Sequence, residues 1–356
     1  MGIVDDLVAR PRVVALSLPE RLALTFNDED NAARLLAVYG PDLTYVSGRG
    51  WAVWDGTRYS FRSGGLAALE VGHRLRALVL EEARFAREAA EFPEHEISNT
   101  IAAAAQARPP QKLSREDAIA RLRRAKSAEL MRHAVKCGNV AKVRAALDVC
   151  QHRARAEVED MDAEPWVLVA PNGEIDLRAA SAFERPSGAT RDELAQMRAP
   201  WLRETRRHHR PTRCTGALFD PHAECPAFER FIALTQPDEA IRACLQRALG
   251  ACLLGENREQ VAVFLRGEGG NGKSTLLNIF KHVMGQRHGY SAACKVEMFL
   301  DTGNIQSSAA TPEEVNLPGA RAYIATEPGA RDVLSGKKIK ALTGGDGRQA
   351  RANYAD

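Results

Sequence analysis

The chain has 356 residues, of which 45% are hydrophobic, and this predicts two or three domains with buried cores. Its formal net charge of +3 is too small to indicate a nucleic-acid partner, so only local clusters of charge are informative. The seven cysteines are scattered and form no C-x-x-C pair, which indicates reduced thiols. The sequence has no apolar run of roughly 20 residues and no signal-peptide pattern at its start, which predicts a cytoplasmic protein without a membrane partner.

The N-terminal part of the chain, residues 1–105, is predicted to form a small α+β region. A helix is expected over residues 29–39, with Asn27 or Asp28 as its N-cap. Residues 51–59 place strand-forming side chains on both sides of an Asp-Gly turn, which predicts a β-hairpin.

A long amphipathic helix is expected over residues 66–91, followed by a linker over residues 102–111 that contains two prolines. Residues 106–255 then form a second, mainly helical region that is rich in arginine. Its first helix is predicted to begin after Ser114, where an acidic first turn favours a helix N-terminus. Residues 166–177 interrupt the helices and read as two short strands joined by a Pro-Asn-Gly turn.

A phosphate-binding loop is the most specific motif, and residues 267–275 spell it as G-E-G-G-N-G-K-S-T. The apolar residues 261–265 before it predict a buried strand, and residues 275–283 after it carry the spacing of a helix. The glycines let successive N–H groups face phosphate oxygens, while Lys273 reaches the β- and γ-phosphates and Ser274 ligates Mg²⁺. The predicted ATP-binding set is Gly267, Gly269, Gly270, Asn271, Gly272, Lys273, Ser274 and Thr275.

A second motif lies about fifty residues further on, where residues 321–328 read R-A-Y-I-A-T-E-P. A buried strand that ends in an acid is the Walker B arrangement, in which Glu327 would orient the attacking water and help to hold Mg²⁺. Glu327 and Lys273 are therefore the predicted catalytic residues. We assign residues 256–356 to an α/β P-loop ATPase core.

A third motif follows, and the three together are similar to one family. Residues 337–346 read K-K-I-K-A-L-T-G-G-D, and the set resembles the superfamily 3 helicases of phage and plasmid primase-helicase proteins, the poxvirus-like nucleoside triphosphatases. Upstream, D-A-E-P-W at residues 162–166 and N-G-E-I-D-L at residues 172–177 are similar to blocks of the helical domain that precedes the motor in this family.

The resemblance implies an AAA+-like helicase that couples Mg-ATP hydrolysis to movement on single-stranded DNA. Family members form rings, hexameric by analogy, and work with other replication proteins, here in the cytoplasm of a bacterial host of a phage or mobile element. The resemblance also implies a channel loop at the end of the third motif. The candidate DNA contacts are Lys337, Lys338, Lys340, Gly344, Gly345 and Arg351. The alternative for the lysines is a solvated helix face.

Two departures from the family pattern bear on activity. Members continue into a strand with a polar sensor residue and then an arginine finger, whereas this sequence stops at Asp356. We therefore expect a C-terminally truncated motor with an incomplete parallel sheet, which binds ATP weakly and turns it over poorly. No acidic metal site of a primase is recognisable in residues 1–110, so primer synthesis is not assigned.

Other candidate sites are less specific. Seven basic side chains between Arg203 and Arg213 would form either a DNA-binding patch or a solvated surface. The arginines of residues 115–132 favour a solvated face, and the histidines and cysteines of residues 208–225 match no common zinc pattern. Trp51 and Trp54 favour a packed core over stacking on bases.

Two rival functions remain open. A P-loop kinase would need an acceptor pocket and a lid, and the Thr-Gly-Gly-Asp block at residues 343–346 argues against it. A non-catalytic DNA-binding or assembly module would keep the helical region without a working motor. DNA binding that is indifferent to ATP would favour this second rival.

Overall fold

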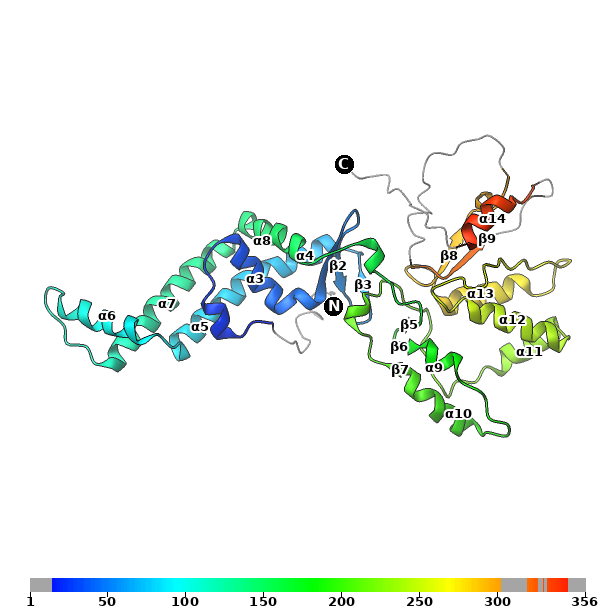
Figure 1. Cartoon of the computed structure of the whole chain (residues 1–356), viewed down its shortest axis with the longest axis horizontal. Helices are drawn as coiled ribbons and strands as arrows, with labels where there is room; N and C mark the ends of the chain where they lie inside the picture. The colour runs from blue at the N-terminus through cyan, green and yellow to red at the C-terminus, as the bar shows by residue number, and fades with distance from the viewer. Residues whose placement is uncertain (1–14, 302–318, 326–328, 330–331, 345–356) are drawn as a thin grey trace. The chain divides into compact units, whose positions relative to one another are not determined.

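The computed structural model describes residues 15–301, 319–325, 329 and 332–344 (Figure 1). The chain divides into two compact units, of which the first comprises residues 1–55 and 59–157 and the second residues 56–58 and 158–356. The boundary that we place near residue 105 falls inside the first unit, and the one near residue 255 inside the second. The division into three regions therefore stays a prediction.

The first unit combines helices with a small sheet. Its helices are α2 (Leu18–Leu22), α3 (Asp28–Tyr39), α4 (Gly64–His73), α5 (Leu75–Ala89), α6 (Glu94–Ala105), α7 (Arg115–Cys137) and α8 (Val140–Arg153). Its strands are β1 (Leu43–Val46), β2 (Gly50–Trp54), β3 (Tyr59–Ser60) and β4 (Arg155–Ala156), in the sheet order β3-β2-β1-β4. Figure 1 shows α5 and α7 side by side along much of their length, with α6 beside one end of α7.

Local signals predicted several of these elements. The side chain of Asn27 accepts a hydrogen bond from the backbone N–H of Asp30 and so caps α3. Ser114 and Asp117 form a capping box at the start of α7. Strands β2 and β3 pair antiparallel with Trp54 opposite Tyr59, which confirms the hairpin.

The expected single helix over residues 66–91 is instead two helices, α4 and α5, separated at Arg74. The backbone N–H of Arg74 bonds to the carbonyl of Val71, three residues earlier, so the α-helical pattern is interrupted by one tight turn. The expected linker is also shorter than predicted, because its first residues belong to α6.

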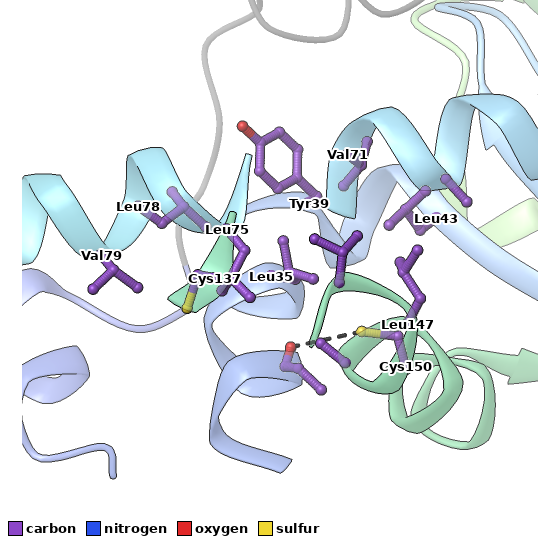
Figure 2. Close-up of a cluster of buried hydrophobic side chains, with 14 of the residues drawn as sticks. Leu35, Tyr39, Leu43, Val71, Leu75, Leu78, Val79, Cys137, Leu147 and Cys150 are labelled. Carbon is purple, nitrogen blue, oxygen red and sulfur yellow. Dashed lines mark hydrogen bonds between the residues drawn. The ribbon is translucent and has the colours of Figure 1, made fainter. Parts of the chain in front are cut away.

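The core of the first unit lies between α3, α4, α5, α7 and α8 (Figure 2). Leu35, Leu75 and Cys150 are fully buried there. The backbone of α8 comes close to α4 because Gly72 has no side chain, and a Cβ at that position would lie 2.6 Å from a methyl group of Val143. Trp51 and Trp54 are both buried, as expected for core residues.

Within the described residues, the second unit contains two separate small sheets. Strands β5 (Val167–Ala170), β6 (Gly173–Asp176) and β7 (Leu202–Arg203) are antiparallel, whereas β8 (Ser291–Cys294) and β9 (Ala322–Ala325) are parallel. Its helices are α9 (Leu177–Ser181), α10 (Arg191–Arg198), α11 (Pro226–Thr235), α12 (Glu239–Ala251), α13 (Lys273–Met284) and α14 (Gly336–Thr343). The strand pair expected over residues 166–177 is confirmed as the β5–β6 hairpin.

The prediction of a buried strand over residues 261–265 is wrong. This segment has no regular structure, and the side chains of Val261, Val263 and Phe264 are 56%, 56% and 61% exposed. A strand needs a neighbour for its backbone groups, and within the described residues β8 and β9 pair with each other and not with this segment. The side-chain amide of Asn257 bonds to the N–H and the carbonyl of Val261 instead.

The described architecture is thus a mixed α/β fold with small sheets. All seven cysteines are free thiols. A search of the described residues finds no helix that is both long and apolar enough to cross a membrane.

Candidate functional site

The glycine-rich loop lies directly before α13, as the motif requires. Gly270 and Gly272 adopt φ values of +71° and +81°, a left-handed conformation that costs glycine little. Helix α13 begins at Lys273, so its first backbone N–H groups have no partner within the helix. The loop and the helix start together form a concentration of N–H donors at the positive end of a helix dipole.

The side chain of Lys273 folds back over this loop. Its Nζ donates to the carbonyl of Gly267 at 2.9 Å and to Oδ1 of Asn271 at 2.8 Å. A Cβ built on Gly267 would lie 1.9 Å from Nδ2 of Asn271 and 3.2 Å from Nζ of Lys273. The side chains of Asn271 and Lys273 thus occupy the space beside Gly267. The ammonium group is thus held by two acceptors within the loop.

Most of the loop is open to solvent. Gly267, Gly269, Gly270 and Asn271 are exposed, and so are Ser274 and Thr275 in the first turn of α13. The hydroxyl of Ser274 therefore stands one residue from Lys273 on an exposed surface. A hydroxyl in this place is a suitable ligand for the Mg²⁺ that accompanies a nucleoside triphosphate.

The strand of the second motif is present as β9, in parallel register with β8 from Ser291 opposite Ala322 to Cys294 opposite Ala325. Arg321, just before β9, is largely buried and donates to the carbonyls of Val167 and Leu253. Its guanidinium lies 4.6 Å from the ring centroid of Tyr290. Burial lowers the pKa of Arg321, and the nearby Tyr290 opposes that shift. Glu327, the predicted catalytic acid, lies outside the described residues.

The lysines of the third motif lie on α14 and differ in their surroundings. Lys338 donates through Nζ to the carbonyl of Leu300 at 2.6 Å, so it holds the chain after β8. Lys337 and Lys340 are exposed on the same helix. Gly344 follows the end of α14, and its N–H bonds to the carbonyl of Lys340. Gly345 and Arg351 lie outside the described residues.

The arginine-rich segment of residues 203–213 is bound to acidic residues of its own unit. Glu174 is fully buried, and its carboxylate accepts from Nε of Arg203 at 2.7 Å and from the backbone N–H of Arg206 at 3.1 Å. Nδ1 of His209 lies 3.0 Å from the same carboxylate. These contacts favour a structural role for this segment, so the reading as a DNA-binding patch loses support.

A second acid, Asp162, binds the end of the same segment. The carboxylate of Asp162 accepts from the backbone N–H groups of Thr212 and Arg213, and from the hydroxyl of Thr212. Arg210 pairs with Asp160 at 3.2 Å. The sequence marked Asp162 and Glu174 as parts of family blocks, but no local pattern indicated that both acids hold one distant segment.

The family is established by comparison with known proteins. A family model described as D5 N terminal like matches residues 32–237, which is more than half of the chain. The chain belongs to this family. The matched residues include most of the first unit, the acids that hold the arginine-rich segment, and helix α11.

Three curated viral proteins are similar over shorter stretches. The chain is 33% identical over 126 residues to a protein of Acanthamoeba polyphaga mimivirus named "Putative helicase L207/L206", which covers 35% of this chain and 13% of the relative. It is 29% identical over 140 residues, or 39% of this chain, to "Putative helicase 121R" of Invertebrate iridescent virus 3. It is also 31% identical over 126 residues, or 35% of this chain, to "Putative helicase 022R" of Frog virus 3. The matches span 14% and 12% of those two relatives. The resemblance to a helicase family is thereby supported at the level of a D5-like helicase.

Proposed function

We propose that this chain is the nucleotide-binding part of an ATP-dependent DNA helicase or translocase of superfamily 3, acting in phage or plasmid replication. The observation that carries the proposal is the arrangement of Lys273 across a glycine loop at the start of α13. That arrangement, within a member of the D5 N-terminal-like family, is the one expected for binding the phosphates of ATP.

The residues of the loop fit Mg-ATP through their donors. When bound, Mg-ATP supplies the phosphoanhydride bond whose hydrolysis drives movement. The backbone N–H groups of residues 269–273 bind phosphate oxygens, and Nζ of Lys273 exchanges its two loop acceptors for phosphate oxygens. Ser274 would hold Mg²⁺, and Glu327 would orient the attacking water and share in that ion's hydration shell.

The proposed partner is single-stranded DNA within a homo-oligomeric ring, hexameric by family analogy, together with other replication proteins. Lys337 and Lys340 are suited to phosphate contacts because they are exposed and lie on one short helix. Lys338 is less suited, because it already donates to a backbone carbonyl.

The experiment that tests this function measures ATP hydrolysis by the full chain with and without single-stranded DNA. We expect slow turnover by this chain, and weak Mg-ATP binding that is lost in Lys273→Ala and kept in Lys281→Ala, a control near the other end of α13. Filter binding of Mg-ATP under the same conditions separates binding from turnover. Absence of any binding that depends on Lys273 would contradict the proposal.

One observation favours a second candidate, a non-catalytic DNA-binding or assembly module. The segment before the loop forms no strand and leaves three large apolar side chains, Val261, Val263 and Phe264, exposed. A core that is open at this point would hold the loop less firmly than a working ATPase requires. Binding of single-stranded DNA with an affinity that is unchanged by Mg-ATP and by Lys273→Ala would identify this second function.

A further inference from the structure

We infer that Phe231 and Thr235 of α11 are positioning residues for the phosphate-binding loop. Both residues belong to the segment that matches the D5 N-terminal-like family, whereas the loop itself lies beyond that segment. The inference rests on the proposed function, because it concerns the placement of the same nucleotide site. Through the contact of these two side chains with the loop, the family region would act on that site.

The contact is visible at the last glycine of the loop. A Cβ at Gly272 would lie 2.8 Å from Cγ2 of Thr235 and 3.1 Å from ring carbons of Phe231. The side chains of Thr235 and Phe231 therefore fill the space where a side chain of residue 272 would lie. The φ value of +81° at Gly272 turns the chain from the loop into α13, so α11 lies against the turn that directs the first N–H groups of the helix.

The two side chains are themselves held in place. The hydroxyl of Thr235 donates to the carbonyl of Phe231 at 2.9 Å, one turn earlier, which fixes the side-chain rotamer and directs the methyl group to the loop. The ring of Phe231 is half-buried, and its centroid lies 6.3 Å from that of Phe228. A fixed methyl group and a rigid ring form a firm support for the loop.

The opposite end of α13 is attached to the same family region. The N–H of Gly216 donates to the carbonyl of Val283 at 2.9 Å, and a Cβ at Gly216 would lie 2.1 Å from the carbonyl oxygen of His282. Met284, the last residue of α13, is fully buried in a cluster with Leu168 of β5. The C-terminal end of α13 is thus held by Gly216 and the β5 cluster, and the residue just before its N-terminal end contacts α11.

Positioning of this kind matters because the site works through the direction of its N–H groups. A displacement of about 1 Å in a binding group is enough to lower activity by roughly a hundredfold in enzymes. Phe231 and Thr235 contact the loop at Gly272, so the inferred effect on binding passes through that residue.

The test uses two substitutions of Thr235 that separate the methyl group from the hydroxyl group. Thr235→Ser keeps the hydroxyl and loses the methyl group, whereas Thr235→Val keeps the methyl group. We expect Thr235→Ser and Phe231→Leu to weaken Mg-ATP binding by ~10-fold and Thr235→Val to weaken it by no more than ~2-fold. Leu234→Ala is the matched control, because Leu234 lies on the same helix and is 75% exposed.

Hydrogen exchange in the absence of nucleotide gives a second readout. We expect faster exchange of the amides of residues 268–275 in Thr235→Ser and Phe231→Leu, with unchanged exchange in β5 and β6. Equal exchange and equal affinity in all variants would overturn the inference while leaving ATP binding by the wild type intact. If the wild type shows no Mg-ATP binding that depends on Lys273, the proposed function fails and the inference fails with it.

Discussion

Arg34 and Glu82 form an ion pair in which both side chains are fully buried, with Nε of the arginine 2.9 Å from Oε2 of the glutamate. The guanidinium also donates to the carbonyls of Thr25 and Leu24, so it joins α5 to the turn before α3. Burial raises the pKa of Glu82, and the charge of Arg34 opposes that shift. The pair is therefore a buried ionic contact inside the first unit.

The first prediction concerns this pair. Glu82→Gln leaves the charge of Arg34 buried without a counter-charge, and we expect it to lower the free energy of unfolding of the first unit by about 3 kcal/mol. Hydrogen exchange in α3 and α5 would measure the loss for that unit alone. Glu88→Gln is the control, because Glu88 is exposed on the same helix, and it should cost below about 1 kcal/mol. Equal losses in both variants would refute the prediction.

The second prediction concerns pH. Burial, with the nearby charges of Arg34, Lys136 and Lys142, lowers the pKa of His133 from 6.5 to about 4, and Asp28 opposes the shift. The unfolded chain therefore binds a proton at a higher pH than the folded one, so stability is present above pH 6.5 and is lost as the pH falls towards 4. The loss should approach about 3 kcal/mol.

Unfolding of the first unit measured between pH 7 and pH 4 would check this dependence. The slope should be smaller in His133→Gln, which removes the titrating ring, and unchanged in His95→Gln, whose histidine is exposed on α6. The prediction is wrong if His133→Gln and the wild type lose the same free energy over this range.

The third prediction concerns the acid that holds the arginine-rich segment. Glu174→Gln removes the charge that faces Arg203 and His209, and we expect it to destabilise the second unit by roughly 2–3 kcal/mol. The figure is below that for a fully buried pair because the side chain of Arg203 is 35% exposed. Asp160→Asn breaks only the exposed contact with Arg210 and should cost below about 1 kcal/mol. Thermal denaturation would measure the loss of stability in each variant, and hydrogen exchange in β5–β7 would assign that loss to the second unit.

The fourth prediction concerns DNA contacts on α14. If Lys337 and Lys340 bind phosphates, replacing both with alanine should weaken binding to single-stranded DNA and reduce the dependence of log affinity on log salt by about 1.4. Titrations of a labelled oligonucleotide at several salt concentrations would give this slope. Lys112→Ala, an exposed lysine of the first unit, is the control and should leave the slope unchanged. An unchanged slope in the double variant would remove α14 from the DNA-binding surface.

Local patterns predicted the elements whose structure depends on neighbouring residues. Asn27 and Ser114 cap helices because the cap acts within three residues of itself. The hairpin of β2 and β3 and that of β5 and β6 follow from turn residues between short strands. The glycine loop and the start of α13 were predicted for the same reason, because all residues of the motif lie within nine positions.

Predictions failed where the outcome depends on a distant partner. Residues 261–265 have the composition of a buried strand, but a strand forms only beside another strand, and composition does not show whether one is present. The break at Arg74 was also missed, for a different reason, because the apolar spacing continues through it without a break.

The sequence by itself therefore determined the glycine loop, the caps and the hairpins, because these depend on residue types at short spacing. Only the tertiary structure decided that Glu174 holds the arginine-rich segment and that Phe231 and Thr235 support Gly272. Both relationships join residues about thirty or more positions apart, and they arise from the packing of whole elements, which no local pattern of side chains records.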